Sequence, residues 1–419
     1  MTVCTSGRRV RYFYFLLLWL LFFVGYLGRA NYVMALPLIQ ADLGLNHTMA
    51  GLSVGILFLG YILCQFAGTR VGLAWGPRKA LLVGLCWWGL FTALTGVASA
   101  LMAMLLVRFL MGAGQTLQPA SSWLFLCNWF PRTEWNRVNT VVLTSIAMAG
   151  VMTPLLVTGV LAVSSWHGTF FATTAFYLLL AVVVWRFVYD SPEKHPAVSA
   201  QELSEIRQAH CDYKPDTYAP TPRMFRLLLN PGIVILTLVY FLQSYALWGF
   251  TTWLPSYLAT ERELGMVSMG LKLSVVCGVA LLGMLVVGPL VEKLFRRRLR
   301  LFLSTVWILG ALGIFYGHTT QNVTLSVVNF AFGACFGLFM FISVFWHLPR
   351  SILPHKVFNR ATNLFMTAGQ LAGITAPIIM GWLIDNSVYH WDSAFLTVEA
   401  ALILAAALVL LVPRKPMAQ

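Results

Sequence analysis

Two arginines lie inside apolar segments of this sequence, and they are the residues best suited to chemistry. Arg29 follows an almost unbroken apolar run from Phe13 to Phe23, and Arg108 lies within the stretch LLVRFLMGAG. A buried charge in such a segment is costly, so it usually faces water or a partner. Because a planar guanidinium binds a carboxylate or phosphate through paired hydrogen bonds, the two residues predict an anion site. For Arg108 an alternative stays open, a structural tie to backbone carbonyls near a helix end.

Other polar side chains interrupt the apolar segments and could hydrogen-bond a polyhydroxy acid. Their spacing often places neighbours on one helix face, since residues three, four or seven apart share a face. The predicted substrate-binding set beside the arginines is Tyr61, Gln65, Gln115, Gln118, Ser145, Tyr240, Gln243, Trp248, Asn363 and Gln370. The alternative for each member is that its amide or hydroxyl connects helices to one another, which is common in membrane proteins.

The composition indicates a membrane protein. Hydrophobic residues make up 59% of the chain, charged residues only 10%, and the mean hydropathy is +0.78. These values exclude an ordinary soluble domain. Apolar runs of the roughly 20 residues needed to cross a bilayer recur along the chain. The predicted fold is all-α, with twelve transmembrane helices at approximately 12–39, 48–68, 80–99, 102–126, 139–162, 169–188, 232–257, 268–291, 301–317, 323–346, 361–384 and 393–412.

The net charge of +14 follows the membrane pattern and does not indicate nucleic acid. Most of the 28 Lys and Arg fall in alternate connecting segments, whereas the other connections are nearly free of them. Polyanion-binding residues would instead cluster on one soluble face. The alternation predicts that both termini are cytoplasmic, in a cell membrane that we expect to be a bacterial inner membrane. Membrane lipid is thus an expected partner, and nucleic acid is not.

One long polar segment, residues 189–230, divides six spans from six. It contains an expected amphipathic helix that starts at Ser199, with Glu202 placed for a capping box. We therefore predict an N-terminal half at 1–188, a cytoplasmic linker at 189–230 and a C-terminal half at 231–419. Similar turns follow the second and eighth spans, GTRVGLAWGPRK at 68–79 and GPLVEKLFRRR at 288–298. Both turns hold a glycine followed by basic residues.

The two halves and several motifs resemble the major facilitator superfamily, and within it the anion:cation symporter family of sugar-acid and organic-anion transporters. The similar stretches are GRANYVMALPLIQADLGL, GILFLGYILCQFAG, RFLMGAGQTLQPASSWLFLCNWFPRTEWNR, SPEKHPAVSAQELSEI, WLPSYL and GQLAGITAPIIMGWLID. The resemblance implies a monomer that transports a small organic anion by alternating access. It places Arg29 on helix 1 and Arg108 on helix 4, both lining a central cavity between the halves. It also implies a gate formed by the residues of the two similar turns, namely Gly68, Gly76, Arg78, Gly288, Glu292 and Lys293.

The sequence departs from that family where protons are thought to load. Members commonly carry an aspartate before the first arginine and a glutamate in the fourth-span motif, whereas this chain has Gly28 and Gln115. Neither can bind a proton. Glu399 is the one carboxylate well inside an apolar run, and we expect it to have a structural partner. Seven of the eight histidines fall in segments that read as loops.

The favoured function is thus a secondary or facilitative transporter of a small organic anion, not obligately coupled to protons at the usual positions. Two alternatives remain: a transporter-like receptor that binds an anion without moving it, and an exporter of an anionic metabolite or drug. Nothing in the sequence indicates an enzyme, because nucleophile motifs, phosphate loops and metal-ligand clusters are missing. No metal or cofactor is expected.

Overall fold

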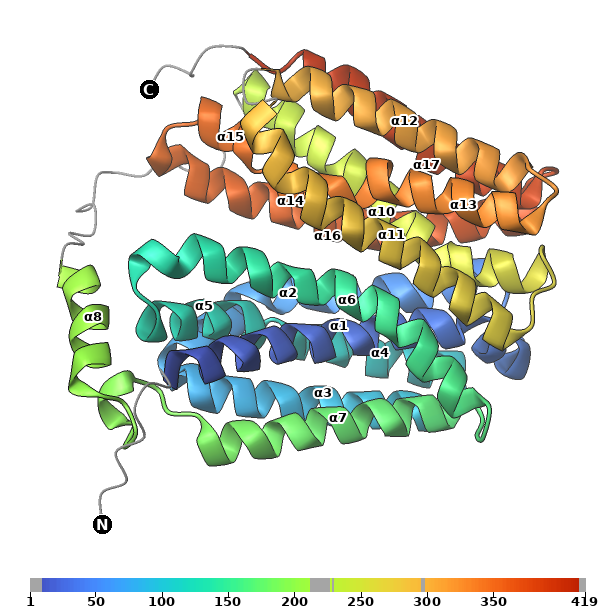
Figure 1. Cartoon of the computed structure of the whole chain (residues 1–419). Helices are drawn as coiled ribbons and strands as arrows, with labels where there is room; N and C mark the ends of the chain where they lie inside the picture. The colour runs from blue at the N-terminus through green and yellow to red at the C-terminus, as the bar shows by residue number, and fades with distance from the viewer. Residues whose placement is uncertain (1–9, 212–226, 228–229, 295–297, 414–419) are drawn as a thin grey trace.

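The computed structural model describes residues 10–211, 227, 230–294 and 298–413. Its helices form two groups, α1–α7 and α10–α17, with α8 beside one end of the first group (Figure 1). Helix α1 begins and α17 ends at this end of the bundle, which we call the terminal end; the opposite end is the distal end (Figure 1).

The first group follows the order of the predicted spans. It consists of α1 (Val10–Leu43), α2 (His47–Trp75), α3 (Pro77–Val97), α4 (Leu101–Gln115), α5 (Leu117–Trp129), the short helix η1 (Arg132–Glu134), α6 (Trp135–Leu161) and α7 (Trp166–Phe187). The linker contributes η2 (Pro192–Lys194) and α8 (Ala200–Cys211). Since residues 212–226 and 228–229 lie outside the described residues, the domain boundaries at 188 and 231 stay predictions.

The second group has one irregular span. It consists of α10 (Pro231–Thr260), α11 (Met266–Leu294), α12 (Leu299–Thr319), α13 (Val323–Gly333), the π-helix η3 (Ala334–Phe339), α14 (Met340–Val344), α15 (His347–Ile352), α16 (His355–Asn386) and α17 (His390–Leu410). Helices α13, η3 and α14 run on as one apolar segment.

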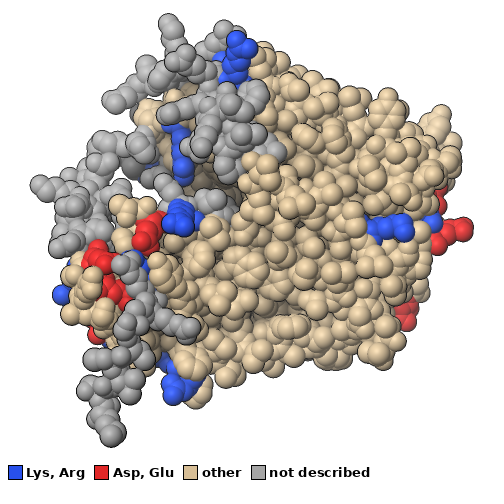
Figure 2. Space-filling view, viewed as in Figure 1, with Lys and Arg blue, Asp and Glu red and all other residues tan. Residues whose placement is uncertain are grey.

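In the described residues, twelve helical segments are long and apolar enough to cross a membrane, which confirms the predicted all-α fold and span count. Several segments extend beyond the predicted ends; the first covers Val10–Leu43. Figure 2 shows the expected surface, with charged side chains gathered toward the two ends and an uncharged band between them on the face in view. Apolar side chains such as Phe66 and Met102 are each 76% exposed, as contact with lipid would require.

The fourth span is broken at Thr116, between α4 and α5. Pro119 has no backbone N–H and cannot donate to the carbonyl of Gln115, four residues earlier. The Thr116 hydroxyl bonds back to the Ala113 carbonyl at 2.7 Å. The break therefore places Gln115 at the last position of α4, where its side chain reaches α1.

Helix α8 is fixed to the start of α1. Its predicted beginning is confirmed, because the Ser199 hydroxyl accepts from the Glu202 N–H at 3.1 Å. The Glu202 carboxylate, however, reaches another helix: it accepts from the N–H groups of Val10 at 3.2 Å and Arg11 at 3.1 Å. Since the first amides of a helix have no internal acceptor, Glu202 stabilises the N-terminus of α1.

The prediction that seven histidines are loop residues was wrong for most of them. His47, His355 and His390 are the first residues of helices, and His167, His210 and His318 lie within helices. Only His195 lies in a connecting segment. Helices continue past the apolar core of each span, so polar residues at span ends remain helical.

Candidate functional site

Arg29 lies near the middle of α1 and is partly buried. Its Nε donates to Oε1 of Gln115 at 2.8 Å, and its Nη2 bonds to the same oxygen. The guanidinium also lies over the rings of Tyr26, at 5.4 Å, and Phe58, at 5.6 Å. The partner of Arg29 is thus a neutral amide, so its positive charge is oriented but not neutralised.

Arg108 supplies a second positive charge from α4 and is only 3% exposed. Its guanidinium lies 3.8 Å from the ring centroid of Tyr32, and its Nε donates to the Ser53 carbonyl at 3.4 Å. Arg29 and Arg108 are near enough for their charges to repel each other. The contact with the Ser53 carbonyl is what a structural role of Arg108 would produce. Like that of Arg29, however, the positive charge of Arg108 is not neutralised.

The carboxylates of the described residues lie away from the two arginines. Of the 14 Asp and Glu, Glu399 is the one well inside an apolar segment, and its Oε1 lies 2.9 Å from Nε2 of His318 in the second group. Nδ1 of the same histidine lies 2.9 Å from Asp392. Within the described residues, neither Arg29 nor Arg108 forms an ion pair. The interior of the first group therefore carries two uncompensated positive charges.

Gly28 has no room for a side chain. A Cβ atom there would overlap the hydroxyl of Tyr177, which extends from α7 and is fully buried. An aspartate at this position, as the family resemblance would suggest, would need Tyr177 to move. The aromatic side chain thus fills the space in which a proton-binding carboxylate would otherwise lie.

Aromatic side chains from both groups surround Arg29. The ring of Trp248 on α10 meets that of Phe58 on α2 at 4.8 Å, so the predicted residue Trp248 joins the two groups next to the guanidinium. Tyr61 lies within range of the charge of Arg29. Tyr240, also predicted, packs instead against aromatic rings of the second group, Phe341 among them. The structure therefore brings the predicted residues Trp248 and Tyr61 near Arg29.

Other predicted substrate-binding residues have partners away from Arg29. Gln243 is fully buried and donates to the Leu338 carbonyl of the π-helix at 2.8 Å. The Ser145 hydroxyl bonds within its own helix, and Gln118 donates to the Leu21 carbonyl at 3.3 Å. The contacts of Gln243 and Gln118 match the helix-connecting alternative, whereas the Ser145 bond stays within one helix.

The remaining three predicted substrate-binding residues are Gln65, Asn363 and Gln370. Gln65 and Gln370 are partly buried, and Asn363 is exposed. Oε1 of Gln370 is buried and has no hydrogen-bond partner among the described residues.

The predicted gate residues of the first group lie together within that group. Gly68 packs against Thr116, where a Cβ atom would overlap the hydroxyl. Gly76 has a φ of 78°, which favours glycine in the turn before α3. The Arg78 N–H donates to Oδ1 of Asp190 at 2.9 Å. The side chains of the remaining three, Gly288, Glu292 and Lys293, lie outside the described residues.

The sequence did not predict three tyrosines near the two arginines, Tyr26, Tyr32 and Tyr177. Tyr26 lies three residues before Arg29 and so on the same helix face, a signal that was present. Tyr32 and Tyr177 gave no such signal, because an aromatic residue in an apolar span is usually packing or interface.

Twelve apolar helices in two groups, with paired guanidinium charges inside, are the features of a multi-pass membrane transport protein. The chain belongs to the Major Facilitator Superfamily, whose family model matches residues 18–355. Curated relatives include a probable sulfoacetate transporter of Cupriavidus necator, 28% identical over 88% of this chain and 86% of the relative. A D-galactonate transporter of Escherichia coli is 27% identical over 97% of this chain and 96% of its own length. These relatives are transporters and not enzymes.

Solved structures share the fold. A bacterial homologue of the human lysosomal transporter Spinster, in an inward-facing and occupied conformation, superposes with a TM-score of 0.80 at 13% identity, over 98% of both chains. The inward-open xylose transporter of Escherichia coli gives 0.74 at 14% identity, over 96% and 95% of the two chains.

Proposed function

We propose that this protein is a secondary transporter that moves a small organic anion across the membrane by alternating access. The observation that carries the proposal is the pair of interior guanidinium groups without a carboxylate partner. An anion would supply the missing negative charge, binding the fork of Arg29 through two hydrogen bonds in a low-dielectric site. Arg108 adds attraction from a fixed position, while Tyr61 and Trp248 shape the surroundings of Arg29.

The relatives support the same substrate class. Sulfoacetate, D-galactonate and galactarate or D-glucarate, named for three of them, are small anions that bear acidic groups. A sugar acid or a short carboxylate or sulfonate is therefore the substrate class proposed here. One relative, a quinolone resistance transporter of Acinetobacter baumannii at 24% identity, keeps an exporter of an anionic drug as the second candidate.

Transport in this proposal is not obligately coupled to protons at the usual family positions. Gly28 and Gln115 cannot titrate, and Tyr177 fills the space beside Gly28. Moving one negative charge inward against 100 mV costs about 2.3 kcal/mol. Anion exchange, passive uniport or export would each satisfy that constraint without a proton. We further propose that the protein is a monomer in the cell membrane, with both termini in the cytoplasm and the distal end facing outward.

The test is binding and uptake by the purified protein in liposomes, with labelled sugar acids, dicarboxylates, aromatic acids and sulfoacetate. Arg29→Lys keeps the charge but loses the planar fork, so we expect severely weakened binding in a folded protein. Arg108→Lys should weaken uptake less. The matched control is Arg262→Lys at the distal end, which should behave like the parent. Uptake of neutral or cationic compounds in place of anions would overturn the proposal, and binding without uptake would favour a receptor.

A further inference from the structure

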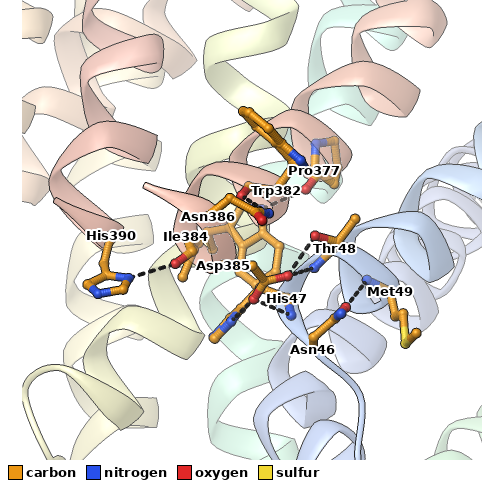
Figure 3. A network of polar contacts seen from close by, with 11 residues as sticks. Asn46, His47, Thr48, Met49, Pro377, Trp382, Ile384, Asp385, Asn386 and His390 are labelled. Atoms are coloured by element: carbon orange, nitrogen blue, oxygen red, sulfur yellow. Dashed lines mark hydrogen bonds and ion pairs between the residues drawn. The ribbon is translucent and has the colours of Figure 1, made fainter. Parts of the chain in front are cut away.

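A single carboxylate joins the two groups of helices at the distal end. Asp385, near the end of α16, accepts hydrogen bonds from the first residues of α2 (Figure 3). Its Oδ1 lies 3.1 Å from the His47 backbone nitrogen and 2.8 Å from His47 Nδ1. Its Oδ2 lies 2.8 Å from the Thr48 backbone nitrogen and 2.6 Å from the Thr48 hydroxyl. A side chain of one half therefore caps a helix of the other.

The cap meets a real deficit at the start of α2. The first N–H groups of a helix have no internal acceptor and carry partial positive charge. Asn46 satisfies one of them, at Met49, with a distance of 2.8 Å. Asp385 satisfies two more, and hydrogen bonds to a carboxylate are stronger than those between neutral groups. Separating the halves here would leave these donors and the carboxylate without each other.

Glycines let the same two helices approach along their distal parts. A Cβ atom at Gly381 would overlap the His47 carbonyl oxygen, and one at Gly51 would overlap that of Pro377. At Gly55 it would lie 2.9 Å from the Ile374 carbonyl oxygen. Backbone contact of this kind leaves no space for a solute between α2 and α16. The two helices are thus closed against each other from Asp385 inward.

We propose that Asp385 is a positioning residue of transport, a latch that holds the distal gate closed and must release His47 and Thr48 before the site can open distally. The latch acts on the balance between the two gate positions and does not touch the substrate. This inference rests on the proposed transport function, but its readout needs no substrate.

The experiment measures access from the distal side. In a cysteine-free background, Ile374→Cys places a thiol at the position of α16 whose backbone packs against Gly55. A membrane-impermeant maleimide is then added to the outer face of oriented vesicles. Asp385→Asn keeps the shape of the side chain but replaces a carboxylate oxygen by an amide donor, which cannot accept from the N–H groups of α2. The distal gate should therefore open more often, and labelling should accelerate roughly tenfold. The matched control is Asp392→Asn, which removes a distal carboxylate that bonds His318 within the second group only. Its labelling should stay within about twofold of the parent, the scatter expected for an uncoupled site.

Two further variants keep the test decisive if Asp385→Asn folds poorly. Thr48→Val removes one donor to the carboxylate and should raise labelling in the same direction by a smaller factor. Thr48→Cys combined with Asp385→Cys should form a disulfide on oxidation that stops distal labelling, with recovery on reduction. Unchanged labelling in Asp385→Asn and Thr48→Val, or an equal rise in Asp392→Asn, would overturn the latch. A labelling change in a protein that transports no anion would leave the latch standing and overturn only the proposed function.

Discussion

Replacing Gln115 by glutamate should create the proton dependence that the native site lacks. The side-chain amide oxygen of Gln115 already lies 2.8 Å from Nε of Arg29. Gln115→Glu would put a carboxylate there without changing the shape of the side chain. At neutral pH this carboxylate would pair with Arg29 and compete with the anionic substrate, so binding should weaken.

The expected magnitude follows from this geometry. With charges about 4 Å apart and an effective dielectric near 20, the attraction is about 4 kcal/mol. Desolvation of the introduced carboxylate offsets part of it, because Gln115 is only 3% exposed. A net coupling of about 1.5–3 kcal/mol, typical of hydrogen bonds to charged groups, corresponds to roughly 10- to 100-fold weaker binding.

The assay is substrate binding by calorimetry on the purified protein from pH 8 to pH 4. The parent should show little change, whereas Gln115→Glu should regain affinity only toward the acid end of this range, because a carboxylate paired with Arg29 takes up a proton only in stronger acid than a free glutamate needs. Gln115→Met is the control, since it removes the acceptor without adding charge and should bind within a few-fold of the parent. If Gln115→Glu binds like the parent at pH 8, Arg29 is not the group that holds the anion.

Two further predictions concern stability. Gly28→Ala should lower the melting temperature in detergent, because its Cβ would overlap the Tyr177 hydroxyl and overpacking costs about 1–3 kcal/mol. Adding Tyr177→Phe should restore much of this loss. If the two substitutions act independently, the packing argument is contradicted. Burial among aromatic rings lowers the pKa of His195 in the folded protein. The unfolded chain therefore binds more protons in acid than the folded protein does. The stability that neutral His195 contributes is complete above a pH of about 6.5 and is lost as the pH falls through the folded pKa. His195→Gln should therefore lose less thermal stability than the parent between pH 7.5 and pH 5, and equal losses would refute the assignment.

The spans could be predicted from the sequence because the hydropathy of a segment is a local property. Every apolar run that is long enough to cross a bilayer became a helix. The break at Thr116 and the π-helix at Ala334–Phe339 could not be placed in advance. The first lies in the polar stretch QTLQPASS at 115–122, where Pro119 hinted at a break, whereas the second interrupts an apolar segment without a change in polarity.

The candidate site was predictable in part. The cost of an interior charge identified Arg29 and Arg108 without any structure. Their surroundings depend on contacts between distant segments: Gln115 is 86 residues from Arg29, and Gly28 meets Tyr177 on another helix. The sequence does not show whether an amide in an apolar span faces a substrate or another helix. The different surroundings of Gln243 and Gln115 therefore could not be predicted.

The polar contacts of the distal end were the least predictable. His47 and Asp385 are 338 residues apart and lie at span ends, where polar side chains are common. His318 pairs with Glu399 across 81 residues, although the expectation that Glu399 has a structural partner agrees with this contact. Sequence position showed that such residues lie near one end of the membrane, but not which of them meet.

The most direct test of the account is uptake into liposomes in which the substrate gradient, the membrane potential and the pH gradient are set independently. Because the site carries fixed positive charge and the native residues at 28 and 115 cannot titrate, uptake should follow the substrate gradient and the potential, or an internal counter-anion. A pH gradient alone should drive no accumulation when the potential is clamped and no counter-anion is present. Accumulation under those conditions would contradict the account, because it would show that proton binding drives transport although Gly28 and Gln115 cannot titrate.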